Sequence, residues 1–196
     1  DALGSSLAWG AVLEGRGHRV TYVVPNRYPS FLEWMENIGK FRIFKDDKDG
    51  ETAALISRAK VIFCMYFNQI DRLEGLGQTI SANDQATFVL VDHHLAPPQG
   101  FDIVFSYPDS SSTSFLVYKI IELPYGSVLL TTAIGDALFV GIMTDTVNFA
   151  FSFFSSELFP GVATLLVMLF IEQQIPYLGY NSLAEERVSQ QWFPSN

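Results

Sequence analysis

The chain has 196 residues, of which 48% are hydrophobic, so it can bury a sizeable core without disulfides or structural metals. Its formal charge of −9 argues against a broad surface for duplex DNA, because such surfaces neutralise phosphates with Lys and Arg. The one cysteine, Cys64, excludes an intramolecular disulfide framework and predicts a reducing, cytoplasmic location.

The first half of the chain alternates helix-like and strand-like segments. Helices are expected over residues 3–14, 30–37, 51–59 and 70–80. Strands rich in β-branched and aromatic residues are expected over 20–24, 41–44, 61–65 and 88–91. Because helices separate strands that are apolar on both faces, the pattern predicts an α/β fold: a mostly parallel sheet with helices on both faces.

The second half is predicted to be helical. Helices are expected over residues 113–122, 132–143, 157–171 and 182–192. The uncharged apolar run 158–171 has 14 residues, fewer than the roughly 20 that a membrane span needs, so we expect a buried or interface helix.

The domain prediction is one domain over residues 1–180, with a linker beginning over 181–196. The chain opens on Asp1, without an initiator Met or a signal-peptide pattern. We therefore expect the natural N-terminus to lie upstream of this residue.

Polar residues that suit a metal ion follow the predicted strand 88–91. Asp92, His93 and His94 would lie at its carboxyl end, where open α/β sheets gather their ligands. Imidazole binds Mn²⁺, Fe²⁺ or Zn²⁺ well, and carboxylate suits Mn²⁺ and Mg²⁺. A solvated surface loop is the alternative, but two of the three histidines adjoin one aspartate here, which favours a metal or phosphate role.

Two other carboxylates each allow two interpretations. Asp145 follows an apolar helical run, where burying an unpaired carboxylate is costly, so either Thr144 and Thr146 satisfy it locally or a cation does. Asp1 precedes a predicted helix, and taken alone it would be explained as an N-cap.

Three segments together resemble the DHH family of phosphoesterases: DALGSS at 1–6, VDHH at 91–94 and GIMTDT at 141–146. Residues 17–26 resemble the family's second strand, and residues 111–114 its substrate-side helix start. The order and spacing agree over nearly the whole chain. The nearest subgroup comprises bacterial enzymes that degrade very short RNA and dephosphorylate phosphoadenosine phosphate, for which the description exopolyphosphatase-related is also used.

The resemblance implies a two-metal centre, with Mn²⁺ usual and Mg²⁺ as an alternative, that activates a water for attack on phosphorus. It implies Asp1 and His93 as ligands of one metal and Asp145 as a ligand of the other. Asp92, His93 and His94 are implied as catalytic residues, with Asp92 orienting the histidines and His94 contacting the phosphate.

The resemblance also implies substrate-binding residues outside the metal ligands. Asn68, Ser112 and Thr113 are expected to bind substrate, the last two by donating hydrogen bonds to a phosphate at a helix start.

The sequence departs from the family pattern at several positions. Tyr66 stands where an aspartate is expected, and a neutral phenol is a poor bridging ligand for hard cations. Val147 replaces a usual glycine, although a position with positive φ would resist a β-branched residue. Phe115 replaces a usual glutamate. The His and Asp that normally precede Asp1, and the C-terminal substrate domain, do not occur in this sequence.

Three functions are therefore open. The first is hydrolysis of short oligoribonucleotides, dinucleotides and 3′-phosphoadenosine 5′-phosphate. The second is a catalytically impaired relative that binds nucleotide or a partner, and the third is an exopolyphosphatase or pyrophosphatase. Short RNA or nucleotide is the expected partner, duplex DNA and membranes are not, and self-association is left open.

Overall fold

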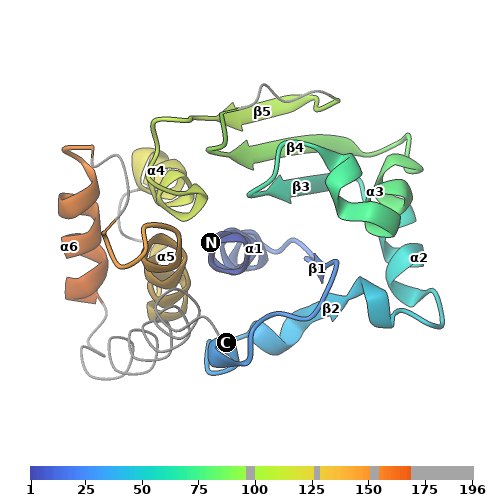
Figure 1. The fold of residues 1–196 in the computed structure, drawn as a ribbon, viewed down its shortest axis with the longest axis horizontal. Coiled ribbons are helices and arrows are strands. Elements are labelled where there is room, and N and C mark those ends of the chain that lie inside the picture. Colours follow the sequence, from blue (N-terminus) through green and yellow to red (C-terminus); the bar gives the residue numbers. More distant parts are fainter. Residues whose placement is uncertain (96–99, 126–128, 151–154, 169–196) are drawn as a thin grey trace, which may run out of the picture.

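The computed structural model describes residues 1–95, 100–125, 129–150 and 155–168 (Figure 1). Its α-helices are α1 (Ala2–Gly15), α2 (Glu51–Ser57), α3 (Glu74–Ser81), α4 (Thr113–Tyr125), α5 (Thr132–Asp145) and α6 (Leu158–Met168). Its strands are β1 (Tyr22–Val24), β2 (Phe41–Ile43), β3 (Val61–Met65), β4 (Thr87–Asp92) and β5 (Ile103–Ser106). The predicted linker over 181–196 and the predicted helix over 182–192 lie outside the described residues.

All strand pairs of the described chain are parallel, which confirms the predicted fold class. The strands form two sheets, a pair β1–β2 and a three-stranded sheet in the order β3–β4–β5. In the larger sheet Met65 lies opposite Val91, and Asp92 lies opposite Ser106. The carboxyl ends of β3 and β4 therefore lie side by side, where the candidate ligands were expected.

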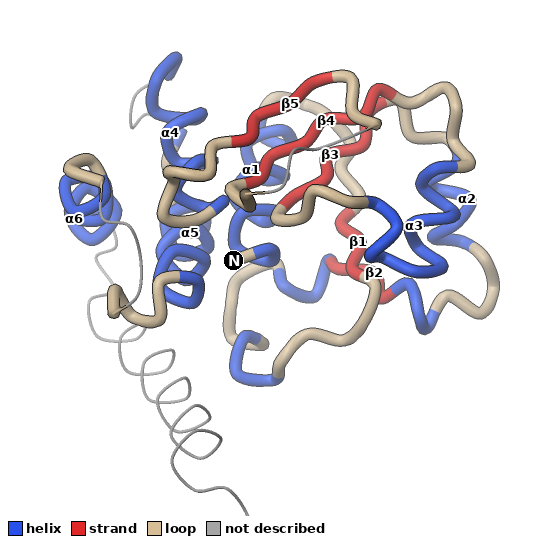
Figure 2. Tube along the Cα trace, turned by 45° about the horizontal axis from the view of Figure 1, so that its top comes forward, coloured by secondary structure: helices blue, strands red, loops and turns tan. Residues whose placement is uncertain are grey.

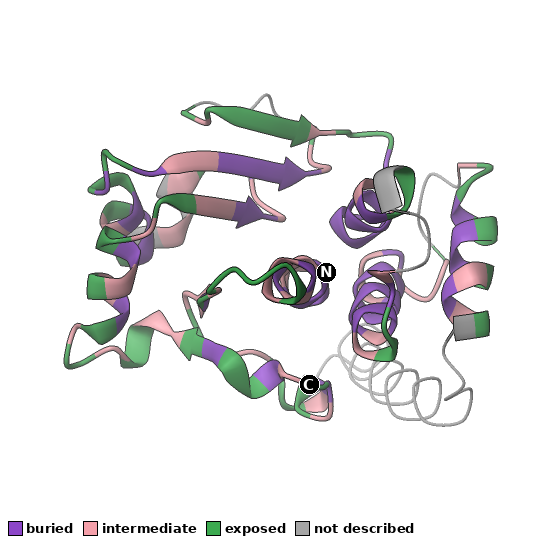
Figure 3. Cartoon of the chain, turned by 180° about the vertical axis from the view of Figure 1, so that it is seen from behind, coloured by how far each residue is buried: buried purple, intermediate pink, exposed green. Residues whose placement is uncertain are grey.

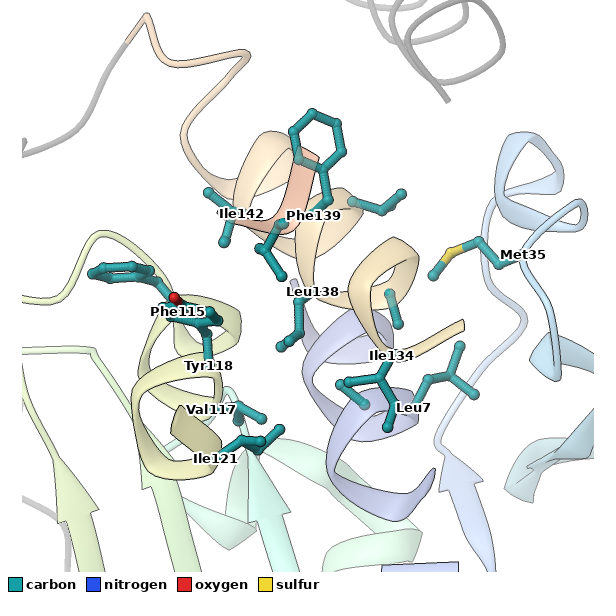
Figure 4. Close-up of a cluster of buried hydrophobic side chains, with 14 of the residues drawn as sticks. Leu7, Met35, Phe115, Val117, Tyr118, Ile121, Ile134, Leu138, Phe139 and Ile142 are labelled. Atoms are coloured by element: carbon teal, nitrogen blue, oxygen red, sulfur yellow. The ribbon is translucent and has the colours of Figure 1, made fainter. Parts of the chain in front are cut away.

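Helices cover both faces of the strands, as predicted (Figure 2). On one face, Ile56 of α2 and Leu76 and Ile80 of α3 form a small core with Ile62 and Phe88. The larger core lies on the other face, where α1 and α4 pack against the sheet and its residues Phe63, Met65 and Val91. Helix α5 packs in turn on α1 and α4, with Leu138 and Ile134 among the side chains between them (Figure 4). In the described part of the chain, no helix is both long and apolar enough to cross a membrane.

Two local predictions were wrong. Residues 30–37 form only the 3-10 turn Ser30–Leu32, and Asn37, at the end of the predicted range, adopts a left-handed φ of 65° outside helical backbone. Strand β5 was missed, since it is four residues long and lies at the edge of the sheet, where Ile103, Val104 and Phe105 are all exposed (Figure 3).

Glycines let the first helix approach the helical half closely enough to build the site. A Cβ on Gly4 would overlap the carbonyl oxygen of Ala137, so α1 and α5 cross at short range. A Cβ on Gly141 would overlap the side chain of Ser114 and lie 3.2 Å from Asp1 Oδ1. The start of α1, the start of α4 and the last turn of α5 therefore meet at one point.

Candidate metal centre

The structure brings three of the predicted residues into one cluster. Asp1, His93 and Asp145 each offer a ligand atom, and these atoms all lie within 4.8 Å of one another. One imidazole nitrogen and two carboxylates form a donor set suited to a divalent cation such as Mn²⁺. The residues come from positions far apart in the chain, so the fold itself assembles the group.

Asp1 is held by the start of α4. Its Oδ2 accepts a hydrogen bond from the Thr113 amide at 2.7 Å, and its Oδ1 accepts one from the Ser114 amide at 2.8 Å and one from the Ser114 hydroxyl. The Asp1 side chain makes no hydrogen bond to its own helix α1. The simple N-cap interpretation was therefore wrong: the carboxylate neutralises the positive end of a different helix.

His93 is oriented from both ring nitrogens. Nδ1 lies 3.1 Å from the carbonyl oxygen of Ser110, which can only accept, so Nδ1 carries a proton. Nε2 lies 3.1 Å from Asp145 Oδ2. This arrangement leaves Nε2 as the atom available to a metal.

The contact between His93 and Asp145 shifts the pKa of both side chains. Burial disfavours the charged imidazolium, but the hydrogen bond and negative charge of Asp145, together with the Ser110 carbonyl, outweigh it and raise the pKa of His93. Burial would raise the pKa of Asp145, but hydrogen bonds from His93 and Tyr66 outweigh it and lower that pKa. Below the raised pKa of His93, this pair is an imidazolium against a carboxylate.

His94 pairs with the aspartate of its own motif. Its Nδ1 lies 2.6 Å from Asp92 Oδ1, and its amide donates to Asp92 Oδ2 at 3.2 Å. The Asp92 side chain is fully buried at the end of β4, whereas 36% of the His94 side chain is exposed. The buried carboxylate therefore holds the imidazole of His94 through Nδ1, and within the described residues no hydrogen bond is recorded for its Nε2.

The local interpretation of Asp145 was wrong. The Thr144 hydroxyl donates to the Gly141 carbonyl, and the Thr146 hydroxyl donates to the Ile142 carbonyl, so both serve the end of helix α5. The Asp145 carboxylate instead pairs with His93 and accepts a hydrogen bond from Tyr66. Both partners of Asp145 are therefore residues that lie far from it in the sequence.

Tyr66 lies within the site, at the position where an aspartate was expected. It follows β3, and its hydroxyl donates to Asp145 Oδ1 at 2.9 Å. Its ring lies beside both histidines, stacked on His93 and edge-on to His94. The sequence marked this residue as a departure but gave no sign of the contact with Asp145, which lies 79 positions away.

Of the predicted substrate-binding residues, Ser112 and Thr113 lie at the start of α4, which also holds Asp1. Ser112 caps α4, since its hydroxyl accepts from the Phe115 amide at 2.9 Å, and Asn68 is buried in the loop after β3. The Thr113 amide is taken by Asp1. The Thr113 hydroxyl is buried and has no hydrogen-bond partner in the described chain.

The segment after Asp145 shows the backbone strain expected from its sequence. Val147, Asn148 and Phe149 all have positive φ, with Val147 at 52°. A β-branched residue thus occupies a conformation that favours glycine.

The chain is similar to a known protein family and to a solved structure. A family model described as "DHH family, N-terminal domain" matches residues 1–142. A solved structure of an exopolyphosphatase-related protein from Bacteroides fragilis superposes with a TM-score of 0.86 at 29% identity. The match covers 92% of this chain and 53% of that chain, so the present chain spans about half the length of that protein. No curated protein matches.

Proposed function

Since the chain belongs to the DHH family, we propose that it carries the metal-binding part of a hydrolase that cleaves phosphoester bonds. The proposed substrates are short oligoribonucleotides, dinucleotides and 3′-phosphoadenosine 5′-phosphate. The observation that carries the proposal is the convergence of Asp1, His93 and Asp145 within 4.8 Å, beside the Asp92–His94 pair.

The proposed cation is Mn²⁺, with Mg²⁺ as the alternative, held by Asp1, His93 and Asp145. When bound, it would supply positive charge to the phosphate oxygens and lower the pKa of a water molecule. The described residues offer one such group of three ligands. A two-metal centre therefore stays a prediction from the family resemblance.

The other residues of the site would bind and orient the phosphate. The carboxylate of Asp92 holds the Nδ1 proton of His94, which leaves His94 Nε2 to donate to a phosphate oxygen when the ring is protonated. The buried Thr113 hydroxyl would donate a second hydrogen bond, which would give it the partner that it lacks within the described chain.

A second candidate is hydrolysis of phosphoanhydride bonds in polyphosphate or pyrophosphate. The structural similarity to the exopolyphosphatase-related protein from Bacteroides fragilis favours it. A third, a catalytically impaired relative, is favoured by Tyr66, which places a neutral phenol against Asp145 where a further anionic ligand was expected.

Substrate comparison with the full-length protein tests these candidates. With Mn²⁺ present, we expect cleavage of di- and trinucleotides and release of phosphate from 3′-phosphoadenosine 5′-phosphate. Cleavage of polyphosphate or pyrophosphate alone would favour the second candidate. If every substrate stays intact while Mn²⁺ binds, the chain is an impaired relative.

Asp145→Asn is the direct test of the metal group. It keeps the size of the side chain but removes a negative ligand, so we expect turnover to fall at least about 100-fold, more than outer contacts usually cost. Tyr118→Phe is the control, because it removes a hydrogen bond to Glu122 outside the site. Equal turnover in Asp145→Asn and wild type would contradict the assignment.

A further inference from the structure

Tyr66 adopts an unfavourable backbone conformation. Its φ is 68°, in the left-handed region that residues other than glycine avoid. The Tyr66 amide donates to the carbonyl oxygen of Val91 at 3.0 Å, so this turn is tied to the end of strand β4, which the two histidines follow. Strained residues persist where the surrounding structure holds them, and they gather at functional sites.

The strained turn brings the phenol to one particular oxygen of the site. The Tyr66 hydroxyl donates to Asp145 Oδ1 at 2.9 Å, while the other oxygen, Oδ2, lies 3.1 Å from His93 Nε2. The two contacts together hold the carboxylate in one orientation. The hydrogen bond occupies the oxygen directed away from His93.

The ring of Tyr66 is held separately from its hydroxyl. Its centroid lies 5.9 Å from that of His93 with an interplanar angle of 22°, and 4.9 Å from that of His94 with an angle of 64°. A change that removes only the hydroxyl therefore leaves the ring contacts in place. The hydrogen bond to Asp145 can be tested on its own.

We propose that Tyr66 is a positioning residue for the cation: its phenol fixes the Asp145 carboxylate so that Oδ2 is presented together with His93 and Asp1. The phenol is neutral near pH 7, so it acts through Asp145 and not by adding charge to the site. Contacts that orient a metal ligand typically change metal affinity 10- to 100-fold. The inference rests on the proposed function in taking this cluster as a cation site.

Mn²⁺ titration of the full-length protein, followed by the electron paramagnetic resonance signal of free Mn²⁺, tests the role. We expect Tyr66→Phe to weaken Mn²⁺ binding about 10-fold or more. The matched control is Tyr118→Phe, which removes a 2.8 Å hydrogen bond to the Glu122 carboxylate elsewhere on α4 and should bind Mn²⁺ as wild type does.

A spectroscopic measurement separates positioning from a general effect on the fold. With Co²⁺ in place of Mn²⁺, the visible spectrum should differ between wild type and Tyr66→Phe, because the orientation of Asp145 changes. The spectra of wild type and Tyr118→Phe should be the same. Unchanged Mn²⁺ affinity in Tyr66→Phe overturns the inference. An equal loss in both variants, or wild type that binds no Mn²⁺, overturns it too.

Failure of the proposed function gives a different result. Wild type that binds Mn²⁺ but leaves all phosphoester substrates intact contradicts the hydrolase proposal, while the comparison of Tyr66→Phe with Tyr118→Phe still decides the role of Tyr66. Conversely, active wild type with unchanged Mn²⁺ affinity in Tyr66→Phe contradicts only the inference about Tyr66.

Discussion

At the scale of single residues, His93 would couple protonation to metal binding in the proposed cation site. Its Nδ1 donates to the Ser110 carbonyl, so only Nε2 can bind a cation, and without a cation that nitrogen faces Asp145 Oδ2. A proton and a metal ion therefore compete for one atom. Both side chains are largely shielded from solvent, with 17% and 12% exposed, so the competition is not screened as it would be on the surface.

The stability of the metal-free protein should depend on pH through this pair. The pKa of His93 is raised above 6.5, so its contribution is complete below that pH and is lost as pH rises through the raised pKa. The pKa of Asp145 is lowered from 3.8, so its contribution is present above that pH and is lost as pH falls through the lowered pKa.

Urea unfolding in the presence of a chelator tests the loss of stability as pH rises through the raised pKa of His93. We expect a lower midpoint at pH about 8.5 than at about 6, with a smaller difference in Asp145→Asn, which lacks the partner carboxylate. Mn²⁺ affinity should rise over the same window, because Nε2 loses its proton. The same midpoint difference in Asp145→Asn and wild type would count against this pairing.

At the scale of elements, the site depends on how closely three helices approach. Asp1 begins α1, Ser114 lies in the first turn of α4, and Gly141 lies in α5 between them. The absence of a side chain at Gly141 makes room for the Ser114 hydroxyl that bonds Asp1. The same small residue therefore serves both the packing of the helices and the position of a ligand.

Gly141→Ala should disturb both the packing of the helices and the position of the Asp1 carboxylate. Its Cβ would overlap the Ser114 side chain, and overpacking of this kind typically costs about 1–3 kcal/mol of unfolding free energy. Mn²⁺ affinity should fall with it. Gly75→Ala in α3 is the matched control, since the nearest atom to its Cβ would be 3.7 Å away on Phe44. Helix propensity alone predicts that Gly→Ala stabilises the protein at both positions. Urea unfolding should instead show lower stability in Gly141→Ala than in Gly75→Ala. Mn²⁺ titration should show weaker binding in Gly141→Ala and unchanged binding in Gly75→Ala.

At the scale of the whole molecule, the predictable parts were those with local causes. Strands β3 and β4 follow from continuous apolar runs, and the position of the Asp92–His94 motif follows from the end of β4. Strand β5 could not be predicted, because it is only four residues long, and three of them, Ile103, Val104 and Phe105, are exposed, so they lack an alternating pattern. The division into two sheets depends on pairing between distant strands, which no local pattern reports.

The site divides in the same way. The motifs singled out Asp1, His93 and Asp145, which the structure brings together, but they did not single out the groups that hold these side chains in place. Ser110 contributes a backbone carbonyl, for which a sequence has no signal. Ser114 lies in a segment already singled out, yet its bond to Asp1 spans 113 positions and needs the folded helices to be seen.

Metal binding should stabilise the whole fold. Because the cluster exists only in the folded chain, Mn²⁺ at 100 times its dissociation constant should add about 2.7 kcal/mol of unfolding free energy. Urea unfolding with Mn²⁺ and with chelator measures the difference, which Asp145→Asn should largely remove. Equal unfolding midpoints in Mn²⁺ and chelator for wild type would contradict cation binding at this group.

The anchoring of Asp1 by the start of α4 has a consequence for when the ligand cluster forms during folding. The Asp1 carboxylate bonds to amides 112 and 113 positions away, across most of the described chain. Contacts of such sequence separation form late, because the intervening chain must lose its freedom first. A partly folded chain, or one still being synthesised, would therefore lack the site altogether, and capture of the cation would mark the completion of folding.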